Sequence, residues 1–136
     1  MTMDIYKAAG VIVQNKQLLV ARSKGKTHFF APGGKIEGDE TFEEALIREL
    51  KEELKMDIKA GDYELFGSFD AEADDKPGVQ LHMTTFLIKR YDGILEPDNE
   101  IEELCWVDTK NMDVIPMGSI FKHEVLPRLI ARGLVS

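Results

Sequence analysis

The segment from Thr41 to Lys55 constrains the fold more than any other part of the sequence. Four apolar residues recur along it at every fourth position: Phe42, Leu46, Leu50 and Leu54. This spacing places them on one side of an α-helix, where they form an apolar stripe that must pack against another element. Thr41 and Glu44 have the spacing of a capping box, which marks the first helical turn. The rest of the chain must therefore provide an apolar surface that covers this helix.

Short runs of apolar residues on both sides of the helix indicate β-strands. The strands are expected at residues 6–13, 17–21, 63–71, 79–91 and 104–107, with a basic loop at 22–27, a turn at 74–78 and an acidic loop at 96–103. A closing helix is expected over residues 119–132, with Ser119 as its cap and a bend at Pro127. The order of strands, helix, strands and helix predicts an α/β (α+β) sandwich in which a mixed β-sheet is flanked by helices.

Length and composition narrow the class of protein. The 136 residues are the size of one domain, so we expect a single domain over residues 1–136. The formal net charge of −8 argues against binding to polymeric nucleic acid, because an acidic chain repels the phosphate backbone. The lone Cys105 excludes an intramolecular disulfide and favours the reducing cytoplasm. The sequence has neither a signal-peptide pattern nor an apolar run long enough to span a membrane, so no membrane partner is expected.

Three glutamates of the predicted helix form the most informative cluster. Glu49, Glu52 and Glu53 have the spacing i, i+3 and i+4, which places them within one side of the helix. Like charges at this spacing repel each other unless a cation lies among them. A solvated acidic face is the alternative, but a helical wheel places Glu53 at the edge of the apolar stripe. Carboxylates turned towards the protein body suit Mg²⁺, which shares its coordination shell with water and substrate phosphates.

The residues around this cluster form a longer motif. Gly33 and Gly34, which precede the helix, allow the backbone to approach a ligand closely. From Gly34 the chain continues with five residues, Glu40, seven residues, and then Arg-Glu-Leu-Lys-Glu-Glu-Leu-Lys-Met from Arg48 to Met56. This run resembles the signature of the Nudix hydrolases, Gly-x5-Glu-x7-Arg-Glu-U-x-Glu-Glu-x-Gly-U, where U is a bulky aliphatic residue.

One position departs from the signature. Lys55 stands where the Nudix signature has a glycine that ends the helix in a left-handed turn. We expect Lys55 either to extend the helix or to adopt the left-handed turn at some cost in stability. Lys55 is not one of the carboxylates, so the departure leaves the predicted metal site in place.

The resemblance implies a Nudix fold, a cofactor and roles for the motif residues. Nudix hydrolases cleave a nucleoside diphosphate linked to another moiety, with Mg²⁺ as the usual cofactor and Mn²⁺ as an alternative. The implied metal ligands are the side chains of Glu49, Glu52 and Glu53 and the carbonyl of Gly33. Glu40 and Arg48 are implied to orient these ligands.

A further acidic residue from a late loop is common in the family, as a metal ligand or as the general base. We assign this role to Glu100, which lies six residues before Trp106. Four other acidic residues of the same region are alternatives: Glu96, Asp98, Glu102 and Glu103. A solvated acidic loop without such a role is the simpler explanation of the same residues.

Basic residues near the glycines are candidates for phosphate binding. Arg22 and Lys35 are our first choices, ahead of Lys24 and Lys26, which also precede the motif. The alternative is a solvated basic loop.

Aromatic side chains are candidates for contact with a nucleobase. Phe29 and Phe30 are consecutive, so in a strand-like segment one faces the core and the other, Phe30, faces the cleft. His82 and Phe86 share one face of the predicted 79–91 strand, and we expect this face to line the same pocket. A structural role is the favoured alternative for His82.

Within the family, the small size favours the MutT-like enzymes, whose substrate is a small nucleotide. These enzymes cleave (deoxy)nucleoside triphosphates to a monophosphate and pyrophosphate by attack of water on phosphorus. ADP-ribose or a nucleotide sugar is the alternative substrate. Members that read an oxidised guanine can use an amide side chain near the start of the last helix, where this chain has Gly118 and Ser119.

Two other classes of protein are compatible with parts of the pattern. A Nudix-fold binding module without catalysis usually loses the motif carboxylates, whereas all three are present here. A structural acidic protein could match the motif by chance, and its glutamates would then not bind metal. The oligomeric state is expected to be a monomer or a homodimer.

Overall fold

The structure, a computed structural model, describes residues 4–73 and 76–136. The strands form two β-sheets. The four-stranded sheet has the order β4-β1-β6-β5, from β1 (Asp4–Val11), β4 (Gly33–Lys35), β5 (Tyr63–Glu72) and β6 (Gln80–Ile88). The three-stranded sheet has the order β2-β3-β7, from β2 (Val13–Gln14), β3 (Gln17–Ser23) and β7 (Ile101–Val107). The larger sheet is mixed, because β1 is parallel to β6 while β4 and β5 are antiparallel to their neighbours.

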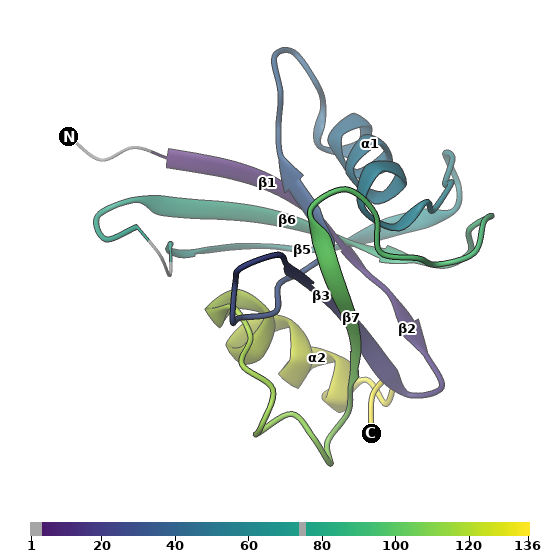
Figure 1. The fold of residues 1–136 in the computed structure, drawn as a ribbon, viewed down its shortest axis with the longest axis vertical. Helices are drawn as coiled ribbons and strands as arrows, with labels where there is room; N and C mark the ends of the chain where they lie inside the picture. The colour runs from purple at the N-terminus through teal and green to yellow at the C-terminus, as the bar shows by residue number, and fades with distance from the viewer. Residues whose placement is uncertain (1–3, 74–75) are drawn as a thin grey trace.

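Helices cover the sheets on two sides. Helix α1 (Phe42–Leu54) lies at the top of the view in Figure 1, and η1 (Phe121–Val125) and α2 (Leu126–Ala131) lie near the bottom, with the sheets between them. Two hydrophobic clusters follow this division, one packed around α1 and the other around η1 and α2. The predicted sandwich of a mixed sheet flanked by helices is confirmed. No helix in the described ranges is both long and apolar enough to cross a membrane.

Helix α1 forms where the apolar spacing predicts it. The hydroxyl of Thr41 accepts the backbone N–H of Glu44, and the Glu44 carboxylate accepts the backbone N–H of Thr41, which completes the predicted capping box. Leu46, Leu50 and Leu54 are fully buried. Burial of this stripe against the larger sheet fixes which face of the helix turns inward.

The final helix begins at the predicted residue, but its cap differs from the prediction and its winding changes. Residues 119–131 are helical, and the N–H of Lys122 already donates to the carbonyl of Gly118, so Ser119 lies inside the helix rather than capping it. The turn over Phe121–Val125 is a π-helix. Pro127 has no N–H and would clash with the preceding turn of a regular α-helix. The wider π turn therefore accommodates Pro127 where the sequence predicts a bend.

Several strand ends also differ from the prediction. The first predicted strand divides into β1 and β2, and β6 ends at Ile88 rather than at residue 91. Strand β3 runs on into the predicted basic loop, and β7 begins at Ile101, inside the predicted acidic loop, because Arg22 pairs with Glu103 across these strands. Opposite charges on directly paired strand residues stabilise a sheet, so charged residues can belong to a strand. Residues 74 and 75 of the predicted 74–78 turn lie outside the described residues.

Lys55 ends α1 in the left-handed conformation. Its φ is 57° and its ψ is 30°, and the N–H of Met56 donates to the carbonyl of Leu50. The N–H of Lys55 itself donates to the carbonyl of Lys51, four residues earlier, which is the hydrogen bond of the αL helix end that a glycine normally provides. Lys55 therefore does the structural work of the signature glycine, with the steric cost of a side chain in that conformation.

We expect Lys55→Gly to stabilise the protein by about 1 kcal/mol, because glycine adopts the left-handed region without the steric penalty of Cβ. Urea denaturation measures the difference. Lys55→Ala is the matched control, because it removes the ion pair with Glu96 but keeps Cβ. Equal stability of wild type, Lys55→Gly and Lys55→Ala would contradict this explanation.

Candidate active site

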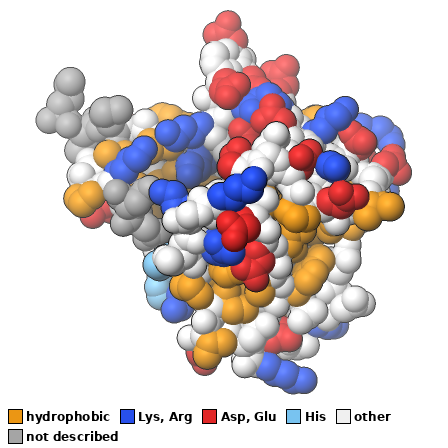
Figure 2. All heavy atoms as spheres, viewed as in Figure 1, with side chains coloured by type: hydrophobic (Ala, Val, Ile, Leu, Met, Phe, Trp, Pro, Cys, Tyr) orange, Lys and Arg blue, Asp and Glu red, His pale blue; other side chains and the backbone are white. Residues whose placement is uncertain are grey.

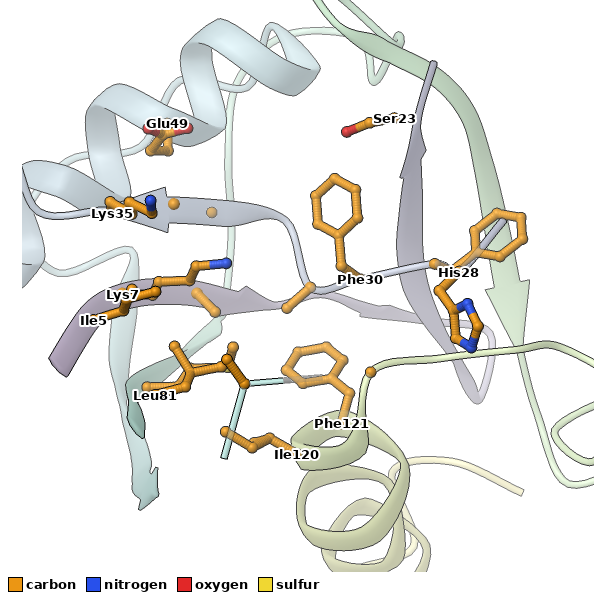
Figure 3. A pocket seen from close by; sticks show the side chains of 18 of the residues that line it. Ile5, Lys7, Ser23, His28, Phe30, Lys35, Glu49, Leu81, Ile120 and Phe121 are labelled. Carbon is orange, nitrogen blue, oxygen red and sulfur yellow. The ribbon is translucent and has the colours of Figure 1, made fainter. Parts of the chain in front are cut away.

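A cavity of about 850 Å³ opens beside the glycines that precede α1. Residues from β1, β4, α1, the segment after β3 and the start of the final helix line it. Glu49, Glu53 and Glu100 lie in its acidic part. Figure 3 shows Glu49 extending from α1 on one side of the cavity, and Phe30 and Phe121 further along it. The cavity thus joins a carboxylate cluster to an apolar compartment.

Glu53 is the buried member of the cluster. It is only 4% exposed, and its Oε1 accepts the backbone N–H of Gly33 at 2.7 Å. Burial raises the pKa of Glu53 to about 8, although the Gly33 hydrogen bond opposes this shift, and the charges of Glu49 and Glu100 raise it further. A cation at this position would favour the ionised carboxylate.

The position of the Glu49 carboxyl group depends on the absence of a side chain at Gly34. A Cβ on Gly34 would lie 2.5 Å from Cδ of Glu49, so the carboxyl group occupies the space that any other residue would fill. Burial raises the pKa of Glu49, and its hydrogen bond with Arg48 opposes the shift. Gly34 therefore allows the Glu49 carboxylate to lie directly against strand β4.

Arg48 links the residues that flank the cavity. Its guanidinium forms a bidentate contact with Glu40, at 2.7 and 2.9 Å, and donates to Glu49 at 2.8 Å. It also donates to the carbonyl of Lys35 at 3.2 Å and to Glu52 at 3.4 Å. These bonds raise the pKa of Arg48 and lower that of Glu40. Such fork-shaped contacts restrain the orientation of the carboxylates.

The three glutamates of the helix are not equivalent in position. Glu49 and Glu53 line the cavity, whereas Glu52 lies on its flank with a half-exposed side chain that contacts Arg48. Gly33 lines the cavity and reaches Glu53 through its N–H group. Ligand roles for Glu52 and for the Gly33 carbonyl stay predictions.

Glu100 is the acidic residue of the late loop that reaches this cavity. Its charge raises the pKa of both Glu49 and Glu53, so the three carboxylates share one electrostatic environment. The alternatives have other partners among the described residues: Glu96 pairs with Lys55, Asp98 accepts the N–H of Asn99, and Glu102 and Glu103 pair with Arg22. Of these five residues, Glu100 alone lines the cavity in the described structure.

The predicted phosphate and base contacts divide into two groups. Lys35 and Phe30 line the cavity as expected. Arg22 does not, which corrects our first choice: its guanidinium pairs with Glu102 and Glu103 and donates to the carbonyl of Lys26. These acidic partners lie some 80 residues later in the chain, so the sequence alone did not reveal them.

The face of β6 that meets the cavity is opposite to the predicted one. Leu81 and Met83 line the cavity. His82 instead stacks on Tyr6 and pairs with Asp70, and Phe86 packs beneath α1. Successive strand residues point to opposite faces, so a face assigned one residue out of phase places every side chain on the wrong side.

The sequence analysis did not select several residues that line the cavity: Lys7, Lys76, Leu81, Met83, Ile120 and Phe121. Lys7 carried a signal, because it is a charged residue at the start of an otherwise apolar strand. Figure 3 shows its side chain extending from β1 towards the space between Glu49 and Leu81. The apolar residues carried no signal that distinguishes a cavity wall from a core.

The donor chemistry of the cavity fits a hard divalent cation. The buried Glu53, the partly buried Glu49 and the exposed Glu100 converge there, and burial, reinforced by the two neighbouring charges, raises the pKa of Glu53 to about 8. In the described part of the chain, no three His, Cys, Asp or Glu residues are already arranged around one point as a metal site. Arg48 engages Glu49 and Glu52, and Gly33 engages one oxygen of Glu53, so these side chains would have to rearrange around an ion.

Comparison with known proteins agrees with the motif and the fold. The NUDIX domain profile matches residues 5–129. The chain belongs to the Nudix hydrolase family. The resemblance predicted from the sequence and the enzyme class are thereby confirmed, and enzymes of this family generally use a divalent cation such as Mg²⁺ and act on small nucleotides.

Individual relatives differ in substrate. The chain is 33% identical to an 8-oxo-dGTP diphosphatase of Proteus vulgaris over 64% of this chain and 78% of the relative. It is 29% identical to an ADP-ribose pyrophosphatase of Methanocaldococcus jannaschii over 85% of this chain and 66% of the relative. The Escherichia coli ORF135 protein, known in solution structure, superimposes with a TM-score of 0.75 at 26% identity, covering 96% of this chain and 94% of that one. At these identities the relatives establish the family and not the substrate.

We expect Gly34→Ala to leave the protein folded but to weaken Mg²⁺ binding and turnover by about 10- to 100-fold, because the new Cβ would displace the Glu49 carboxylate. Isothermal titration with Mg²⁺ and circular dichroism test both parts. Gly67→Ala is the control: its Cβ would also meet a movable side chain, that of Phe69, outside the cavity. Unchanged Mg²⁺ affinity in Gly34→Ala would contradict the assignment of Glu49.

Without metal, the free energy of unfolding should fall as pH rises from about 4.5 to about 8. In this window the folded protein keeps a proton on Glu53 that the unfolded chain has lost, so the folded state binds more protons. A single proton contributes at most about 1.4 kcal/mol per pH unit. Glu53→Gln cannot titrate at this position and should show a shallower decline.

Urea denaturation in EDTA at several pH values measures this effect. Glu64→Gln, which changes an exposed glutamate of β5, should follow the wild type. Parallel curves for wild type and Glu53→Gln would show that Glu53 does not hold the extra proton.

Proposed function

We propose that this protein hydrolyses nucleoside triphosphates to a nucleoside monophosphate and pyrophosphate in a Mg²⁺-dependent reaction. One observation carries the proposal: a single cavity of nucleotide size joins the carboxylates of Glu49, Glu53 and Glu100 to an apolar compartment lined by Phe29, Phe30 and Phe121. The carboxylates suit a metal-bound diphosphate, and the apolar compartment suits a nucleobase. Family membership supports hydrolysis as the reaction class.

The lysines around the cavity favour a triphosphate over ADP-ribose. Although the chain has a net charge of −8, four lysines line this cavity: Lys7, Lys26, Lys35 and Lys76. On the face of the molecule shown in Figure 2, basic side chains gather at the upper left, whereas acidic and basic side chains are mixed at the upper right. A triphosphate carries more negative charge than the diphosphate of ADP-ribose, so it gains more from several cations.

The chain's own residues would divide the work as follows. Glu49, Glu52 and Glu53 would hold the cation, which neutralises the diphosphate and acidifies bound water. Arg48 and Glu40 restrain these carboxylates through the contacts described above. Glu100 would complete the cation's shell or accept the proton of the attacking water. The oxygen of that water bonds to phosphorus while the bridging P–O bond breaks, and pyrophosphate leaves.

The apolar compartment indicates how the base is held. Phe30, Ile120 and Phe121 provide flat or apolar surfaces, and the described cavity lining contains no Asn or Gln. Gly118 and Ser119 line the cavity near the start of the final helix, where an amide would be expected for recognition of an oxidised guanine. Stacking accepts every base, so we expect modest discrimination among bases.

A panel of substrates tests the proposal. It comprises the common nucleoside triphosphates, 8-oxo-dGTP, ADP-ribose, UDP-glucose and a dinucleoside polyphosphate, each with and without Mg²⁺. Phosphate release is measured with pyrophosphatase for triphosphates and with alkaline phosphatase for products that carry a terminal phosphate. We expect Mg²⁺-dependent turnover to concentrate on triphosphates and to fall by about a hundredfold or more in Glu53→Gln, since loss of a ligand exceeds the loss of an outer partner.

Glu64→Gln is the matched control and should retain wild-type turnover. Turnover concentrated on ADP-ribose or UDP-glucose would replace the triphosphate proposal with the alternative that the Methanocaldococcus relative suggests. Tight Mg²⁺ binding without turnover on any substrate of the panel would contradict the proposed activity and favour a binding module.

A further inference from the structure

The loop before β7 is attached to the C-terminal end of α1. Three of its groups donate to successive carbonyls of the last helical turn: the N–H of Glu96 to Leu54 at 3.2 Å, the N–H of Asp98 to Glu53 at 2.9 Å, and Nδ2 of Asn99 to Glu52 at 2.8 Å. The last carbonyls of a helix have no N–H donor within the helix itself. The loop supplies the missing donors and thereby fixes its own position.

Asn99 is the only one of these three that bonds through its side chain. Its backbone has φ of 52°, in the left-handed region that asparagine tolerates better than most residues. The amide therefore turns back onto α1 while the chain proceeds directly to Glu100. On the other side, the carbonyl of Glu100 accepts the N–H of Lys24 at 2.9 Å. Glu100 is thus held between a helix and the basic loop.

The Asn99 bond joins the two elements that carry Glu49, Glu53 and Glu100. Glu52, whose carbonyl accepts the bond, lies between Glu49 and Glu53 on α1, and Glu100 follows Asn99 directly. The Glu100 side chain is exposed, so surrounding packing does little to place it. Its distance from Glu49 and Glu53 depends on where the loop backbone is fixed.

We propose that Asn99 is a positioning residue that sets the location of the Glu100 carboxylate relative to Glu49 and Glu53. The inference rests on the proposed function, because it assigns Asn99 a role through Glu100. Asn99 itself does not line the cavity in the described structure, so it acts without touching the substrate.

Two substitutions separate the amide from the backbone conformation. Asn99→Gly keeps access to the left-handed region and removes the amide. Asn99→Asp keeps the size of the side chain but places an acceptor against the Glu52 carbonyl. We expect kcat to fall by about tenfold in Asn99→Gly and further in Asn99→Asp, with KM for the nucleotide unchanged and a higher Mg²⁺ concentration needed for half-maximal rate.

Asn15→Gly is the matched control. Asn15 also has φ of 52°, but it lies in the turn between β2 and β3, outside the cavity. It should retain the kcat and Mg²⁺ dependence of the wild type. Circular dichroism and thermal unfolding confirm that each variant compared is folded.

A double-mutant cycle with Glu100→Gln gives the decisive readout. If Asn99 acts through Glu100, Asn99→Gly should cause no further loss of kcat in the Glu100→Gln background. Independent, additive losses would overturn the inference, as would wild-type kcat in Asn99→Gly. Failure of the proposed function is distinguishable, because the wild type would then show no Mg²⁺-dependent turnover of triphosphates, or Glu53→Gln would retain that turnover, before any Asn99 variant is compared.

Discussion

The hydrogen bond from the Gly33 N–H to the Glu53 carboxylate joins strand β4 to helix α1, and the geometry of the cavity depends on it. A carboxylate buried to this extent is destabilising unless a donor faces it. Side chains are excluded on both sides of the contact: a Cβ on Gly33 would lie 2.1 Å from the carbonyl of Ala8, and one on Gly34 would collide with Glu49. The strand can therefore lie against the acidic face of the helix only because both residues are glycines.

Arg48 explains how such an acidic helix folds before any cation arrives. Its guanidinium neutralises Glu40 and contacts Glu49 and Glu52, so the repulsion among the helix glutamates is partly offset within the protein. Among the described residues, Glu53 and Glu100 line the cavity without a guanidinium partner. Glu49 links the two groups of glutamates, because it contacts Arg48 and also lines the cavity.

Local patterns predicted the parts of the structure that depend on local contacts. The apolar stripe and capping box located α1, and the motif from Gly34 to Met56 identified the family. The sequence could not assign Arg22, because its acidic partners come from β7, nor choose the face of β6, because this depends on the parallel register between β1 and β6. It could nominate Glu100 among five acidic residues, but only the loop's attachment to α1 explains why that residue reaches the cavity.

The π turn over Phe121–Val125 separates the final helix into two parts with different tasks. Ser119 and Ile120 before the turn and Phe121 at its start line the cavity, while α2 packs into the core. A π turn contains one residue more than an α turn, so losing that residue rotates everything on one side by about 100° relative to the other. A single-residue deletion or insertion at this turn would therefore re-aim the base compartment relative to α2.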